Sequence, residues 1–133
     1  MRRIFYYLFN TFYWLTVMPY NYLCQKLLAA GIAENFAKSS LAASIYGKGI
    51  GVYSRKDYPG ALKLFKTISD YNVNTEHVSY ARYYIAVMYY SGLDVEKNIS
   101  QAKVYLRGAL DSSDGFNSHA KELLTAIETS EDE

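Results

Sequence analysis

Apolar and polar residues along the chain separate an uncharged opening segment from a longer region with helical periodicity. Residues 4–24 contain no charged side chain, whereas Arg2 and Arg3 precede them and Lys26 follows them. A helix rises about 1.5 Å per residue, so one over this stretch would be about 30 Å long, close to the thickness of a bilayer's hydrocarbon core. The pattern therefore predicts a hydrophobic N-terminal helix.

From Tyr20 onward, apolar residues recur at helical spacing, without the alternation that is typical of half-buried strands. Asp57 and Asn98 are suited to capping helix N-termini, and Gly31 and Gly92 to ending helices. The helices expected from these signals cover residues 20–30, 33–47, 57–69, 76–91, 98–110 and 117–128. Helices of this length joined by short turns predict an all-α array of helical hairpins.

Glycine stands at positions 47, 49 and 51, a pattern that is costly inside a helix and predicts a turn. The run lacks the spacing and the preceding strand of a phosphate-binding loop, so a nucleotide site is not expected there. In the helices that follow, the apolar residues of one face define the expected core. They are Ala61, Leu64, Phe65, Ile68, Ala81, Ile85, Met88, Tyr89, Ala102, Tyr105, Leu106 and Ala109.

Parts of the helical region repeat after about 40 residues, a period typical of helical-hairpin repeats. The first half of the repeat pairs Tyr46, Gly49 and Val52 with Tyr89, Gly92 and Val95. The second half pairs Asp57, Ala61, Leu64 and Phe65 with Asn98, Ala102, Tyr105 and Leu106, after a small insertion in the first unit. Each unit would be one hairpin that covers the apolar face of its neighbour.

These positions resemble the Sel-one-like repeat, a branch of the tetratricopeptide-like α-solenoids. The family's pattern is held by Tyr46, Gly49, Gly51, Val52, Asp57, Ala61 and Phe65, and again by Ala81, Ile85, Ala86, Tyr89, Gly92, Val95, Asn98, Ala102, Tyr105, Leu106 and Ala109. The chain departs from it at Lys38, Asp94 and Asn98, where the pattern has Ala, Gly and Asp. The resemblance covers residues 28–126 and implies a short α-solenoid of helical hairpins that acts as a non-catalytic protein-interaction module.

We therefore expect three parts in the chain: a hydrophobic segment at 1–24, a Sel-one-like helical repeat domain at 25–128, and an acidic tail at 129–133. The first part has three interpretations: a membrane anchor, a buried capping or partner-binding helix, and a cleaved signal peptide. Bulky Tyr20, Tyr22 and Leu23 make a poor cleavage site, and we favour the anchor. The residues expected to contact lipid or a partner helix are Phe5, Leu8, Phe9, Asn10, Phe12, Trp14 and Leu15.

The charges around this segment bear on its orientation. Arg2 and Arg3 favour an inside N-terminus, with the repeat domain on the outer, periplasmic or lumenal side. The alternative is a soluble cytoplasmic protein whose N-terminal helix is buried. The net charge of +1 conceals a basic first half and an acidic second half, an arrangement that suits a basic end near anionic lipid and an acidic end that meets a basic partner.

Tyrosine is the most distinctive residue type, with 15 in 133 residues, and it gathers on the helix expected at 76–91. One face of that helix cannot bury all of these rings, so some should line the concave side of the solenoid. The expected partner-binding groove consists of Arg82, Tyr83, Val87 and Tyr90, with Ser40 and Ser44 from the earlier helix. The alternative is that these residues simply pack against the next helix.

Residues for other chemistry are sparse. The single cysteine, Cys24, excludes an internal disulfide and a cysteine-based zinc site, and His77 and His119 have no metal-ligand spacing. No arrangement of nucleophile, base and acid can be argued, and the near-neutral charge opposes nucleic-acid binding. We therefore expect no catalytic residues, no cofactor, no metal and no nucleic-acid partner.

The sequence thus favours a non-enzymatic adaptor tethered to a membrane, for example a bacterial immunity or regulatory protein that binds another protein through its groove. A second hypothesis is an accessory subunit whose opening helix packs into a membrane complex through Asn10 and Thr11. A third, from a different class, is a soluble helical protein with a buried N-terminal helix and a small-molecule or enzymatic role.

Overall fold

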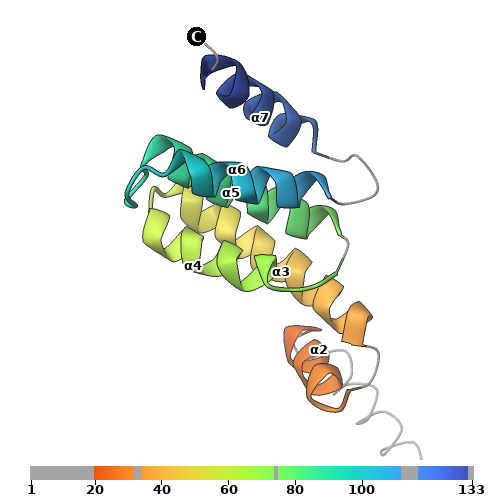
Figure 1. Ribbon diagram of the computed structural model, residues 1–133. Coiled ribbons are helices and arrows are strands. Elements are labelled where there is room, and N and C mark those ends of the chain that lie inside the picture. The colour runs from red at the N-terminus through yellow and green to blue at the C-terminus, as the bar shows by residue number, and fades with distance from the viewer. Residues whose placement is uncertain (1–19, 32–33, 74, 112–116, 132–133) are drawn as a thin grey trace, which may run out of the picture.

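The computed structural model describes residues 20–31, 34–73, 75–111 and 117–131 of the chain. These residues form the helices α2 (Tyr20–Ala29), α3 (Glu34–Ser54), α4 (Tyr58–Ser69), α5 (Glu76–Ser91), α6 (Ile99–Leu110) and α7 (Ser118–Glu131) (Figure 1). No strand occurs in these described ranges. The predicted all-α class is confirmed. Most of the predicted N-terminal helix falls on residues 1–19, which lie outside the described residues.

Each helix packs against the helices next to it in sequence, and α3 also contacts α5 directly. This order carries the chain from α2 at one end of the molecule to α7 at the other (Figure 1). The helices α3, α4 and α5 each contact the other two. As a result, α3 and α5 present adjoining surfaces on one side of the molecule.

The residues that the sequence predicts at the ends of helices cap those helices in the structure. The Asp57 carboxylate accepts a hydrogen bond from the Gly60 N–H at 3.1 Å, and the Asn98 side chain accepts one from the Gln101 N–H at 2.9 Å. Gly92 ends α5 with a φ of 68°, a left-handed conformation that suits glycine. Caps of this kind satisfy backbone groups that have no partner within the helix.

The turn predicted around Gly47, Gly49 and Gly51 is wrong, because α3 continues through all three residues to Ser54. Gly49 is buried against α4: a Cβ atom there would lie 2.6 Å from Cε1 of Phe65. The helices therefore approach closely at this point, and glycine serves that contact rather than a turn. Packing against α4 outweighs the cost of about 1 kcal/mol that each interior glycine imposes on a helix.

The predicted acidic tail at 129–133 is helical as far as Glu131, because α7 extends beyond the expected end at Glu128. Ion pairs hold this last turn against α6, from Arg107 to Glu128 and from Lys103 to Glu131. These contacts join oppositely charged side chains of two helices, and no pattern within one helix reveals them.

The core consists of two main clusters that share α5. The first joins α3, α4 and α5 and contains Ala42, Ala61, Phe65, Ile68, Val78, Ala81, Ile85 and Met88. The second joins α5, α6 and α7 and contains Ala86, Ala102, Leu106, Ala109, Ala120 and Ile127. Cys24 of α2 packs with Ala37 and Leu41 in a smaller third cluster. Most residues of the predicted core are therefore buried, while Leu64, Tyr89 and Tyr105 are half-buried.

Candidate functional site: an aromatic face on α3, α5 and α7

Aromatic rings from α3 and α5 contact one another on the side where these helices meet. The ring of Tyr46 on α3 lies 6.2 Å from that of Tyr80, 6.4 Å from that of Tyr84 and 5.5 Å from that of His77, measured between centroids. We define the aromatic face as Tyr46, Tyr53, His77, Tyr80, Tyr83, Tyr84 and His119. Its tyrosines are half-buried, so each ring is packed on one part and open on another.

Tyr84 connects the aromatic face to the core. Its ring stacks on the fully buried ring of Phe65 at 5.3 Å with an interplanar angle of 16°. It also meets Tyr53 edge-on at 5.1 Å and Tyr83 at 5.5 Å. Aromatic pairs in such geometries stabilise one another beyond the area that they bury, so the face has a fixed arrangement before any ligand arrives.

Tyr83 carries the face onto α7, where the His119 ring lies 6.1 Å away. Burial raises the pKa of Tyr83, and the nearby Tyr84 and the Glu122 carboxylate add to this effect. Burial likewise raises the pKa of Tyr46 to about 12, with smaller contributions from Tyr84, Tyr80 and Glu76. These phenols therefore stay protonated and neutral at ordinary pH.

Two carboxylates border the face, one near each end. Glu76 Oε1 lies 3.9 Å from His77 Nε2, and Glu122 Oε2 lies 4.0 Å from His119 Nδ1. Both side chains are exposed, by 54% for Glu76 and 76% for Glu122. Each end of the face therefore combines tyrosine, histidine and an accessible acid.

Of the groove residues predicted from the sequence, Tyr83, Val87 and Tyr90 lie three and four positions apart on α5, and such residues share one helix face. All three are half-buried, and Tyr83 and Tyr90 also pack against the core cluster of α5, α6 and α7. Ser40 and Ser44 are half-buried on α3. The rings of Tyr83 and Tyr90 thus pack against neighbouring helices, as one interpretation expected, and keep some exposed surface, as the groove interpretation expected.

Arg82 does not join this group, because its guanidinium turns to the other side of α5. Nη1 donates a hydrogen bond to the Gly108 carbonyl at 2.9 Å, and Nη2 donates one to the Ser69 carbonyl at 3.1 Å. The side chain thereby links the last turn of α6 to the end of α4. Arginine suits this role because its planar fork presents several donors at once.

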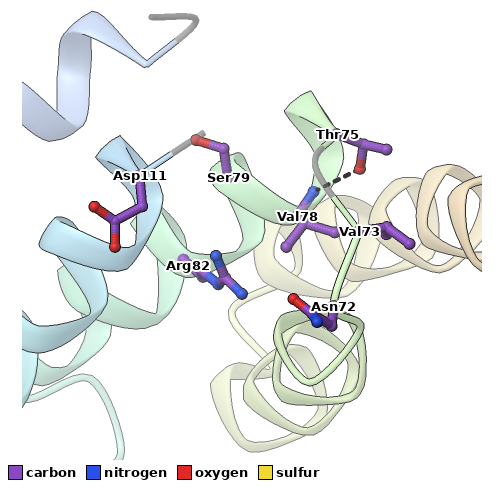
Figure 2. A pocket seen from close by; sticks show the side chains of 7 residues that line it. All are labelled: Asn72, Val73, Thr75, Val78, Ser79, Arg82 and Asp111. Atoms are coloured by element: carbon purple, nitrogen blue, oxygen red, sulfur yellow. Dashed lines mark hydrogen bonds between the residues drawn. The ribbon is translucent and has the colours of Figure 1, made fainter. Parts of the chain in front are cut away.

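Arg82 also lines a cavity of about 350 Å³ between the ends of α4, α5 and α6 (Figure 2). The other lining residues are Asn72, Val73, Thr75, Val78, Ser79 and Asp111. Both terminal nitrogens of Arg82 donate to backbone carbonyls, so the guanidinium is fixed in place in the wall of this cavity.

A buried hydrogen-bond network that the sequence did not reveal fixes α7 to the rest of the molecule. The Ser79 hydroxyl donates to the Ala109 carbonyl at 2.6 Å, and Asn117 Nδ2 donates to the carbonyl and the hydroxyl oxygen of Ser79, each at 3.2 Å. Asn117 Oδ1 also caps α7 by accepting from the Ala120 N–H at 3.1 Å. The cap position of Asn117 was the one available signal in the sequence.

The described residues bear on two further expectations. They contain no group of His, Cys, Asp and Glu that is arranged to hold a metal ion. Within the same ranges, every helix is too short or too polar to span a membrane. The residues predicted to contact lipid or a partner helix, namely Phe5, Leu8, Phe9, Asn10, Phe12, Trp14 and Leu15, lie outside the described residues.

Comparisons with protein-family models, with curated proteins and with solved structures found no match to this chain.

Proposed function

We propose that this protein is a non-enzymatic interaction adaptor, built as a short α-solenoid of Sel-one-like hairpins, that binds a partner protein through the aromatic face. The observation that carries the proposal is the continuous contact from Tyr46 on α3 through Tyr84 and Tyr83 on α5, all half-buried, to the exposed ring of His119 on α7. In a stack of helical hairpins, alternate helices lie side by side, and their side chains form the binding surface.

The chemistry of the face supports binding of a protein. Tyrosine offers a large contact area at a small cost in side-chain entropy, and it is enriched among the residues that dominate interface energies. The stacking of Tyr84 on buried Phe65 holds the face in place in advance, which reduces the ordering cost of association.

The arrangement of the helices supports the solenoid part of the proposal. Helices contact chiefly the helices next to them in sequence. The helices α3 and α5 also touch, although α4 lies between them in the sequence. The described residues hold two full hairpins, α3 with α4 and α5 with α6, flanked by single helices at each end. Repeat arrays depend on such terminal helices to cover the faces of their last hairpins.

The membrane tether through residues 4–18 remains part of the proposal, and its support comes from the uncharged sequence. Phe36, at the start of α3, is 59% exposed, and Tyr22 on α2 is 43% exposed, so this end of the molecule presents apolar surface. Extraction of membranes with alkaline carbonate tests the tether. We expect the full chain to stay with the membrane, and its release into the soluble fraction would contradict the tether.

Photo-crosslinking in cells that produce the protein tests the binding face. A crosslinking amino acid placed at Val87, on the same side of α5 as Tyr83, should capture a defined partner. The matched control is Val104 on α6, which is 60% exposed and lies outside the face. Capture of the same partner with equal yield from both positions would refute the assignment of the face.

A further inference from the structure

We infer that the partner segment that occupies the aromatic face is cationic, with arginine or lysine side chains set among apolar residues. The inference rests on the proposed function, because it names the chemistry of the partner that the same face binds. Such a segment would complement the charge of the aromatic face.

The rings of the face are suited to cations. The face of an aromatic ring is electron-rich, and an ammonium or guanidinium group placed over it is attracted electrostatically. The chain already brings lysines to tyrosine rings elsewhere: Lys26 Nζ lies 5.3 Å from the centre of the Tyr22 ring, and Lys97 Nζ lies 5.6 Å from the centre of the Tyr90 ring. The described residues show no such cation over Tyr46, Tyr83 or Tyr84.

Carboxylates near both ends of the face add negative charge. Burial is the main cause of the raised pKa values of Tyr46 and Tyr83; Glu76 adds a smaller electrostatic contribution at Tyr46, and Glu122 adds one at Tyr83. A cation that contacts either ring would therefore also be attracted by a carboxylate.

Among the helical glutamates that the structure describes, these two are the ones without a lysine or arginine partner. On α7, Glu128 and Glu131 pair with Arg107 and Lys103 of α6. On α3, Glu34 pairs with Lys38. Within the described ranges, Glu76 and Glu122 instead have only a histidine within 4.0 Å. Their charges are thus available to a ligand.

The spacing suits a single short segment. Tyr46 and Tyr83 flank the one ring of Tyr84, at centroid distances of 6.4 Å and 5.5 Å. Alternate residues of an extended peptide point to the same side about 7 Å apart, and residues two turns apart on a helix are separated by about 11 Å. One peptide of either conformation can place two cationic side chains near the two ends.

The test measures binding of three labelled peptides to the full chain by fluorescence anisotropy. In the first, arginine alternates with leucine; in the second, uncharged citrulline replaces arginine; in the third, glutamate replaces it. We expect the arginine peptide to bind about tenfold more tightly than the citrulline peptide, and its affinity to fall as salt is added.

Matched variants locate the effect. Glu122→Gln and Glu76→Gln should each weaken binding of the arginine peptide about three- to tenfold, whereas Glu96→Gln, which removes an exposed charge from the segment between α5 and α6, should leave it unchanged. Equal weakening by all three variants would overturn the inference, since binding would then follow net charge alone.

The peptides also separate this inference from the proposed function. Equal or tighter binding of the citrulline or glutamate peptide, if Tyr83→Ala weakens it, would overturn the cationic chemistry and leave the aromatic face standing as a binding surface. Failure of all three peptides to bind would overturn the inference as well, and the crosslinking at Val87 would then judge the proposed function by itself.

Discussion

At the scale of single residues, the three glycines of α3 differ in what surrounds them. A Cβ atom at Gly49 would lie 2.6 Å from the buried Phe65 ring, whereas at Gly47 and Gly51 nothing lies within 4 Å. We therefore expect Gly49→Ala to destabilise the protein by about 1–3 kcal/mol through overpacking. Gly47→Ala and Gly51→Ala should each stabilise it by about 0.5–1 kcal/mol, because alanine favours the helix.

Urea denaturation followed by circular dichroism measures all three variants. The two outer glycines are the matched controls for the central one. Destabilisation by alanine at positions 47 and 51 would contradict a continuous α3, since that is the result expected where a turn requires glycine.

Arg82 has a structural role, which predicts a separation between stability and binding. Arg82→Ala leaves the carbonyls of Ser69 and Gly108 without their donors and should cost about 1–3 kcal/mol of unfolding free energy. Arg82→Lys should recover only part of this loss, because an ammonium group lacks the planar fork. Thermal unfolding and partner binding measured on the same samples check this: an Arg82→Ala protein of unchanged stability that fails to bind would contradict it.

Tyr46 makes the free energy of unfolding depend on pH in the alkaline range. Its pKa is raised from 10.0 to about 12 by burial, so the folded protein holds this proton more tightly than the unfolded chain does. The contribution is fully present below pH 10 and is lost as the pH rises from 10 to about 12. Urea unfolding at several pH values should show a smaller decline for Tyr46→Phe, and an identical decline would refute the assignment. The pKa values of Tyr53, Tyr71, Tyr83 and Lys66 are also raised, so these groups contribute to the rest of the decline.

At the scale of elements, α7 depends on one side chain at its beginning. Asn117 caps the helix and also reaches Ser79 on α5, and it is buried. Asn117→Ala should therefore cost about 2 kcal/mol or more, from the lost cap and from the buried partners that it leaves. Hydrogen exchange should show loss of protection in α7 before α4, and a uniform loss across the protein would argue against a local anchor.

The helices show why some elements could be predicted from the sequence and others could not. The start of α4, the end of α5 and the start of α6 were correct, because Asp57, Gly92 and Asn98 act through local backbone geometry. The length of α3 was missed because Gly49 faces Phe65, a residue of the next helix, and helical glycine and turn glycine look alike in sequence. The last turn of α7 was also missed, and its ion pairs with α6 are contacts that the sequence of α7 alone does not reveal.

The same distinction holds for the candidate site. Helical spacing predicts that Tyr83, Val87 and Tyr90 share one side of α5, and the structure confirms the helix that carries them. It did not place Arg82, whose direction is set by carbonyls at the ends of two other helices. Nor did it bring Tyr46, His119 and Glu122 to the site, since they belong to helices whose relative positions only the folded structure defines.

At the scale of the whole molecule, the two ends differ in chemistry. At the α2 end, Phe36 is strongly exposed, whereas α7 covers the other end and carries charged residues such as Lys121 and Glu122 on its exposed positions. Terminal helices with polar outer surfaces are typical of the capped end of a repeat array. This asymmetry agrees with a tether at the first end and an aromatic face that lies along the helices between them.

The most direct test of the central claim is the affinity of the crosslinked partner for Tyr83→Ala and Val104→Ala, each compared with the unchanged chain. The account predicts that Tyr83→Ala weakens binding about tenfold or more, while Val104→Ala, on the exposed surface of α6, has little effect. Unfolding of both variants in urea confirms that each is folded at the temperature of the binding measurement. Unchanged affinity of a folded Tyr83→Ala protein would contradict the claim that the aromatic face binds the partner.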